Sequence, residues 1–179
     1  MAFDISAFRS QMPGGGARPN LFKVTLPAPG YVNFPTEKMS FLCKATSLPS
    51  SVIEPLIVPY FGRQVKFAGD RTFEDWTVSI INDEDFLIRD AFERWSDGIA
   101  RHSAGGSKRG AADSNPASYV ADAVIEQYSK SGDVIKSYSM INVFPTNIAE
   151  IPVDWESNSQ VELFDVTFSL DYWTSNTTT

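Results

Sequence analysis

Short apolar runs, most of them alternating with polar residues, recur along the chain and predict a protein built mainly from β-strands. Residues 21–26 place Phe22, Val24 and Leu26 on one face of a strand. Residues 160–172 give the cleanest alternation, with Phe164 and its apolar partners at every second position through Tyr172. Further strands are predicted at 39–48, 51–60, 63–68, 73–81, 119–128 and 134–144.

The connections between these runs carry their own signals. Residues 68–70 form a turn signal between two predicted strands, and residues 129–133 predict the turn of a hairpin spanning 119–144. Residues 145–155 read as an irregular connection. Pro55 and Pro59 interrupt the run at 51–60, and because proline cannot donate to a strand ladder, we expect an edge strand or a protruding loop there.

One segment changes to a helical period. Residues 82–85, Asn-Asp-Glu-Asp, are typical of a helix start, and the apolar residues that follow recur at spacings of three and four. These residues are Ile88, Ala91, Phe92, Trp95 and Ile99. We therefore predict a helix at about 83–100, ended by Gly98 or by Gly105–Gly106, with Phe92 and Trp95 buried against a sheet.

The predicted fold is mainly β: two packed antiparallel sheets forming a barrel or sandwich, with one flanking helix. The length of 179 residues suits one domain. We place that domain at 20–175, after a glycine-containing N-terminal arm at 1–19 and before a C-terminal tail at 176–179. Residues 102–118 are small and polar and predict a long exposed loop.

Charge and cysteine content narrow the classes of function. The formal net charge is −7, whereas a protein that grips nucleic acid by its phosphates normally presents basic side chains. Cys43 is the only cysteine, so no intrachain disulfide forms, and synthesis in a reducing compartment is expected. No signal peptide and no membrane-spanning segment is predicted, so we expect a soluble chain made in the cytosol.

The sequence offers little material for catalysis, and we expect neither an enzyme nor a metal or cofactor site. His102 is the only histidine and lies near a predicted helix end, while Cys43 lies in an apolar run typical of a buried core position. One histidine and one cysteine cannot form a zinc site of the usual type. The acids at 83–85 lack the glycine and distal glutamate of a calcium loop.

Three segments carry a resemblance to a known family. Residues 59–73 (PYFGRQVKFAGDRTF), 76–84 (WTVSIINDE) and 89–95 (RDAFERW) strongly resemble the tail tube proteins of contractile-tailed, myovirus-type bacteriophages. Residues 20–24 and 143–145 also fit in order. The resemblance implies two packed sheets with a flanking helix, six copies per ring, rings stacked into a hollow tube, and DNA passing through the lumen during ejection.

The resemblance also implies where subunits meet and what else they contact. The N-terminal arm and the extended segment at 47–60 are expected to touch neighbouring subunits. Independently of the resemblance, the mixture of acids and bases just beyond that segment suggests surface or interface ion pairs among Arg63, Asp70, Arg71, Glu74 and Asp75. The candidate contact residues are Phe3, Ile5, Phe8, Leu48, Val52, Ile53, Pro55, Ile57, Pro59, Tyr60, Arg63, Asp70 and Arg71. Expected partners are the sheath, baseplate, tail terminator and tape measure proteins, and genomic DNA in the lumen.

The same resemblance gives the negative charge a meaning, because an acidic lumen repels DNA phosphates instead of holding them. It implies a virion tail component made in the host cytoplasm. Two other classes stay open: the tube subunit of a phage-like injection or type VI secretion device, and a monomeric β-barrel enzyme or ligand binder. The last would remain near 19.8 kDa in solution and enclose an apolar pocket.

Overall fold

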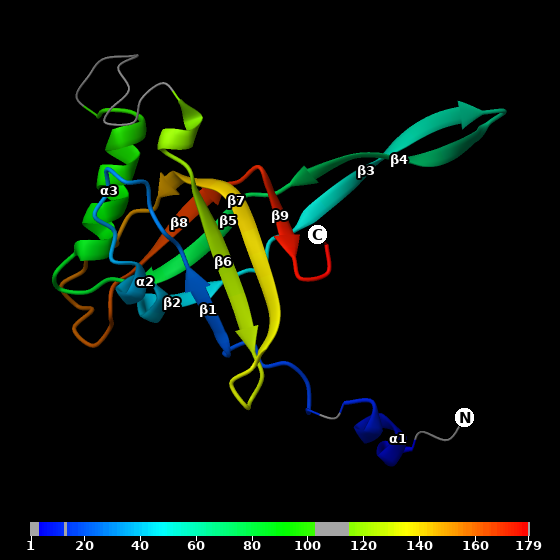
Figure 1. Cartoon of the computed structure of the whole chain (residues 1–179), viewed down its shortest axis with the longest axis horizontal. Helices are drawn as coiled ribbons and strands as arrows, with labels where there is room; N and C mark the ends of the chain where they lie inside the picture. The colour runs from blue at the N-terminus through cyan, green and yellow to red at the C-terminus, as the bar shows by residue number, and fades with distance from the viewer. Residues whose placement is uncertain (1–3, 13, 103–114, 179) are drawn as a thin grey trace.

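The computed structural model describes residues 4–12, 14–102 and 115–178 and shows a β domain from which one hairpin and the N-terminal segment project (Figure 1). Its elements, in chain order, are α1 Ile5–Ser10, β1 Phe22–Thr25, α2 Thr36–Leu42, β2 Cys43–Thr46, β3 Ser51–Tyr60, β4 Arg63–Phe73, β5 Trp76–Ile81, α3 Leu87–Ile99, the 3-10 turn Pro116–Ser118, β6 Ala121–Tyr128, β7 Val134–Ile148, β8 Leu163–Ser169 and β9 Tyr172–Ser175. No helix among the described residues is long and apolar enough to cross a membrane.

Two antiparallel sheets share the long strand β7. Its first part pairs with β6 and β9, and β1 extends that sheet beyond β6. Its last part pairs with β8, which continues through β5 to β2. The strand order β1-β6-β7-β8-β5-β2, with β9 beside β7, therefore confirms the predicted pair of sheets with a helix on one flank.

Asn142 marks the place where β7 leaves one sheet for the other. Its backbone has a φ of 57°, which a side chain adopts only at a cost. Its N–H donates to Asp122 Oδ1 at 3.0 Å, and its Nδ2 donates to Asp171 Oδ2 at 2.6 Å. These bonds hold a register shift between β6 and β7, and such bulges bend a strand.

The core lies between the two sheets and beneath α3. Trp76, Val78 and Ile80 of β5 face it together with Phe164, Val166 and Phe168 of β8, as the alternation predicted. On α3, the Phe92 and Trp95 rings pack on Phe168 at centroid distances of 5.8 and 6.4 Å, and the Trp95 indole N–H donates to Tyr119 O at 2.8 Å. The predicted apolar stripe is confirmed, and burial of these rings is what holds the helix to the sheet.

The predicted end of α3, at about residue 100, agrees with the observed end at Ile99, but its start was predicted four residues too early. The helix begins at Leu87, because Phe86 takes a left-handed conformation and Asp83 and Asp85 bind Lys38. Gly98 lies inside the helix rather than at its end. A Cβ on Gly98 would come within 2.2 Å of the Tyr31 ring, so this glycine makes room for a neighbour instead of ending the helix.

Two predicted strands were also wrong in part. Residues 36–42 form α2, so only Cys43–Thr46 of the predicted 39–48 strand is extended. Alternation would have grouped Met39 with Phe41, whereas Met39 is buried and Phe41 exposed, because Met39 and Leu42 share a helical face. The turn predicted at 68–70 is absent as well, since β4 runs unbroken from Arg63 to Phe73.

The C-terminal half departs from the prediction in length rather than kind. The hairpin at 119–144 is confirmed, but β7 continues through Pro145 to Ile148, and a register shift beside Pro145 accommodates the missing N–H. The predicted strand at 160–172 divides into β8 and β9. Asp171 N donates to Ile141 O at this corner, so Tyr172 begins a new strand on the other sheet.

Candidate assembly surface

The hairpin β3–β4 projects from the domain as a two-stranded ribbon that contacts neither main sheet along most of its length (Figure 1). Every residue from 52 to 72 is exposed. Leu56, Ile57 and Val58 are consecutive, so they point to alternate faces of the ribbon, and both faces are therefore apolar. An isolated two-stranded hairpin is marginally stable in water, and an exposed apolar surface of this kind marks an interaction site.

The tip and the middle of the hairpin are shaped by two glycines. Phe61 and Gly62 have φ values of 44° and 76°, as a two-residue turn of type I′ requires, and Tyr60 pairs with Arg63 across it. The Phe61 side chain is 91% exposed at this tip. Farther back, Gly69 lies so close to the opposite strand that a Cβ would meet Glu54 O at 2.5 Å, beside a register shift. Gly69 thus permits a bulge within a continuous strand.

The base of the hairpin is fastened to the domain by Trp173 of β9. Its indole N–H donates to Ser50 O at 3.0 Å, and its ring lies edge-on to Phe73 with centroids 6.2 Å apart. Tyr138 of β7 packs on the same ring at 5.6 Å. These contacts bind both ends of the hairpin to the first sheet and fix its direction of projection.

Charged side chains along the hairpin have no ion-pair partner within the described residues. Five ion pairs are formed there, and none of them includes Glu54, Arg63, Lys66, Asp70 or Arg71. Within the part of the chain that the structure describes, Arg63, Asp70 and Arg71 therefore form no ion pair, so the expectation that they pair at a surface or an interface stays a prediction.

The hairpin brings together most of the candidate contact residues. Val52, Ile53, Pro55, Ile57, Pro59 and Tyr60 lie on β3, while Arg63, Asp70 and Arg71 lie on β4. Leu48 is exposed in the segment that leads into β3. The prediction of a projecting, proline-containing segment is confirmed, but its predicted span of 47–60 was too short, because β4 pairs with β3 and projects with it.

The N-terminal segment is a second exposed element and lies apart from the hairpin strands. Helix α1 begins after Asp4, whose Oδ1 accepts from Ser6 N at 2.9 Å, and none of its residues is buried. Ile5 and Phe8 are 70% and 67% exposed, so they do not pack on their own domain. Phe3, the third candidate of the arm, lies outside the described residues.

The two side chains considered as candidates for catalysis, Cys43 and His102, both make contacts that have a structural explanation. Burial raises the pKa of the Cys43 thiol to about 12, so this side chain is a core group and not a nucleophile. His102 Nδ1 lies 3.1 Å from Asp97 Oδ1 at the end of α3, in an open groove of about 940 Å³ that Ser96 also lines. No hydrogen bond joins Ser96 to His102, so the groove holds no assembled catalytic triad.

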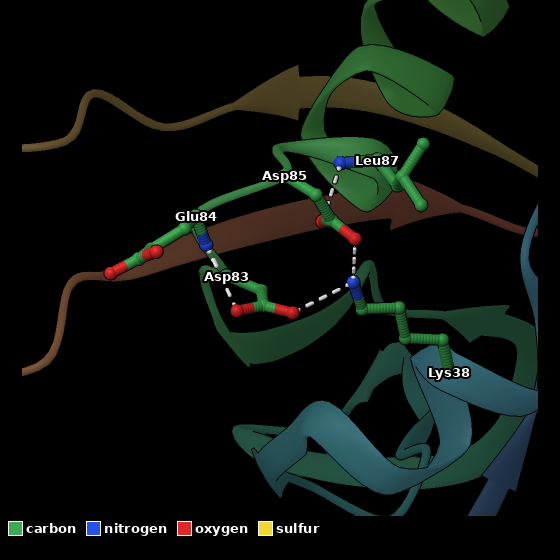
Figure 2. Close-up of polar contacts among 5 residues, drawn as sticks. All are labelled: Lys38, Asp83, Glu84, Asp85 and Leu87. Atoms are coloured by element: carbon green, nitrogen blue, oxygen red, sulfur yellow. Dashed lines mark hydrogen bonds and ion pairs between the residues drawn. The ribbon is translucent and has the colours of Figure 1, made fainter.

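The acidic segment at 83–85 forms an ion-pair cluster with Lys38 of α2 (Figure 2). Lys38 Nζ lies 2.8 Å from Asp83 Oδ2 and also contacts Asp85, while the N–H groups of Glu84 and Leu87 donate to the same two carboxylates. The hydrogen bonds from Lys38 lower the pKa of both aspartates, and those from the aspartates raise the pKa of Lys38. The positive charge that these two carboxylates bind is thus the ammonium group of Lys38.

Sequence reasoning missed two residues with important contacts, Trp173 at the base of the hairpin and Lys38 at the turn before α3. Trp173 follows the predicted strand and shows no signal of its role, because its partners Ser50 and Phe73 are distant in sequence. Lys38 was missed for the same reason, as it lies 47 positions before Asp85 in the sequence.

The fold therefore defines a small β domain with a projecting apolar hairpin, a class of protein suited to self-association. A family model described as phage tail tube protein matches residues 17–176, and the chain belongs to that family. It is 37% identical over 161 residues to tail tube protein gp19 of Enterobacteria phage T4, covering 89% of this chain and 92% of the relative. The tail tube protein of Serratia phage KSP90 is 27% identical over 154 residues, with 84% of each chain covered.

Solved structures of contractile injection systems share the fold. The tube-terminating cap structure of the anti-feeding prophage matches with a TM-score of 0.64 at 17% identity, covering 89% of this chain and 90% of that one. The sheath–tube complex of an extracellular contractile injection system, PVC, matches with a TM-score of 0.60 at 13% identity, covering 97% and 98%. At these identities the likeness concerns the fold alone.

Proposed function

We propose that this chain is the structural subunit of the inner tube of a contractile phage tail. Six copies form a ring, rings stack into a hollow tube, and genomic DNA passes through the lumen during ejection. The observation that carries the proposal is the β3–β4 hairpin, whose apolar faces are exposed in the single chain and need a second chain to bury them. Membership of the phage tail tube protein family supports assembly into a tube, and the hairpin offers a surface through which subunits can associate.

In this proposal each segment of the chain has its own role. Residues 20–175 form the tube domain, the arm at 1–19 and the hairpin contact neighbouring subunits, and 176–179 are a tail. The contacts are made by the exposed candidates Ile5, Phe8 and Leu48 together with those on β3 and β4, and by Phe3 within the arm. The role is structural and needs no catalysis, cofactor or metal.

The proposed partners are those of a tail. The sheath surrounds the tube, baseplate and terminator proteins bind its two ends, and the tape measure protein and DNA occupy the lumen. The related injection systems named above include sheath–tube, baseplate and cap assemblies, which supports these partners by analogy of fold. The protein is made in the host cytoplasm and ends in the virion tail. The identity to phage proteins favours this function over an injection device.

Electron microscopy of the purified protein at rising concentration tests the proposal. We expect the wild type to form hollow rings or tubes. The double variant Leu56→Ser with Phe67→Ser removes an apolar pair that faces across the hairpin, and we expect it to stay monomeric. Its thermal unfolding should be unchanged, because neither residue is part of the core.

The matched control keeps the number of substitutions and the location. Gln64→Ser with Thr72→Ser changes two polar residues of the same hairpin and should assemble like the wild type. A wild-type chain that stays at 19.8 kDa at every concentration, or an apolar variant that assembles normally, contradicts the proposal.

A further inference from the structure

The loop between β7 and β8 exposes large apolar side chains that nothing in the described structure covers. Trp155 is fully exposed, and Val153 and Val161 are exposed by 83% and 66%. A tryptophan is rarely left wholly in water, because burying it gains more free energy than burying most other side chains. We call Val153, Trp155 and Val161 the end patch.

Hydrogen bonds hold this loop beside the segment that leads into α3. Asn82 N donates to Glu162 O at 2.9 Å, and Asn82 Nδ2 donates to Glu162 Oε2 at 2.9 Å. At the other end of the loop, Arg89 Nη1 donates to Ala149 O at 2.6 Å. The loop is therefore attached at both ends to the start of the helix, where Phe86 and Leu87 are also exposed.

The loop that carries the end patch and the hairpin have net charges of opposite sign. Residues 149–162 contain four acids, Glu150, Asp154, Glu156 and Glu162, and no base. Residues 51–73 contain three bases, Arg63, Lys66 and Arg71, against two acids, Glu54 and Asp70. The hairpin thus has a charge of +1 in a chain of −7, and neither set forms ion pairs within the described residues.

The two surfaces lie at opposite ends of the molecule. The hairpin extends from one side of the domain, and the β7–β8 loop lies on the other, near the start of α3 (Figure 1). A hairpin therefore cannot reach the end patch of its own subunit. Contact between two such different surfaces is head-to-tail, and it repeats from copy to copy into a ring or a helical array.

We propose that the end patch is the docking site for the β3–β4 hairpin of a second copy of this chain. The apolar side chains of the hairpin cover Trp155 and Val153, while its basic residues meet Asp154, Glu156 and Glu162. Complementary charge of this kind sets the register and excludes the like-charged surfaces of other copies. The proposal rests on the proposed tube function and adds the surface that receives the hairpin.

Zero-length carbodiimide cross-linking of the assembled wild-type protein tests the contact directly. Lys66 is the only lysine of the hairpin, so we expect an amide between Lys66 and Asp154, Glu156 or Glu162. Mixing isotopically labelled and unlabelled subunits before assembly identifies the link as intermolecular. Cross-links from the amino terminus to these acids instead would assign the patch to the N-terminal arm and overturn the proposal.

Trp155→Ala gives an independent measurement. Trp155 makes no buried contact, so the monomer should melt like the wild type, while the concentration needed for assembly should rise about tenfold or more, as for a central aromatic residue of an interface. Phe41→Ala, which removes another highly exposed aromatic ring, 86% exposed on α2, is the matched control and should leave assembly unchanged.

The outcomes separate the two proposals. If the wild type forms tubes but Trp155→Ala assembles equally well and no link joins Lys66 to the loop, the docking site is wrong and the tube function stands. If the wild type forms neither rings nor tubes, the tube function itself fails.

Discussion

Gly98 shows how a single missing side chain lets two elements meet. It lies in the last turn of α3 with the ring of Tyr31 against it, and Tyr31 donates its hydroxyl to Trp95 O at 3.2 Å. Burial raises the pKa of Tyr31 to about 12, so this phenol keeps its proton and stays a donor at any physiological pH. The segment before α2 is thereby joined to the helix.

Replacing this glycine tests which of two opposed effects is larger. Alanine favours a helix by roughly 1 kcal/mol over glycine, but overpacking costs about 1–3 kcal/mol, and a Cβ 2.2 Å from a ring carbon cannot be accepted without movement. We expect Gly98→Ala to lower the free energy of unfolding, measured by urea denaturation.

Gly30→Ala is the control, because a Cβ there meets nothing within 4 Å. Combining Gly98→Ala with Tyr31→Ala should cost less than the sum of the two single changes, since the clash is then absent. Strict additivity would show that the ring is not the cause.

At the scale of elements, Lys38 joins α2 to the turn before α3. The two aspartates have folded pKa values below their usual range, so their contribution to stability is present above about pH 4 and is lost as the pH falls through the folded pKa values. The raised pKa of Lys38 gives a contribution that is lost only at strongly basic pH. Between these limits the cluster is intact.

Lys38→Met should therefore lower the melting temperature by a constant amount between about pH 5 and pH 9, and this difference should vanish in acid below about pH 3. High salt should reduce the difference, because exposed ion pairs are screened. Differential scanning calorimetry across this range measures it. Lys44→Met, at an exposed lysine outside the ion pairs of the described residues, should show no such pH profile; an identical profile would refute the assignment.

For the whole molecule, the formal net charge of −7 predicts how a tube assembled from this chain would interact with DNA. Each added subunit contributes the same net negative charge, so the tube as a whole would repel the phosphates of DNA. We expect no retention of duplex DNA by assembled tubes in a gel-shift or filter assay, even at about 0.01 M salt, where the Debye length is about 30 Å. Retention that weakens as salt is added would show a local basic path through the tube.

The core strands and the buried face of α3 could be predicted because buried positions in a strand or helix are apolar at regular spacings along the sequence. Trp76, Val78 and Ile80 alternate, and Phe92 and Trp95 keep a helical spacing, so each pattern can be read within a few residues. The hairpin was predicted in part, through Pro55 and Pro59, while Gly69 suggested a turn because a bulge and a turn both call for glycine.

The sequence by itself determined the class of fold, the position of the main helix and the family, since these follow from periodicity, composition and extended similarity. Only the tertiary structure decided that β3 and β4 form one projecting ribbon, that Trp173 fastens its base, and that Trp155 stands uncovered at the opposite end. Each of these depends on contacts between residues far apart in the chain, or on the absence of any. Such contacts leave no local pattern, because what an apolar side chain packs on is settled only when the elements meet.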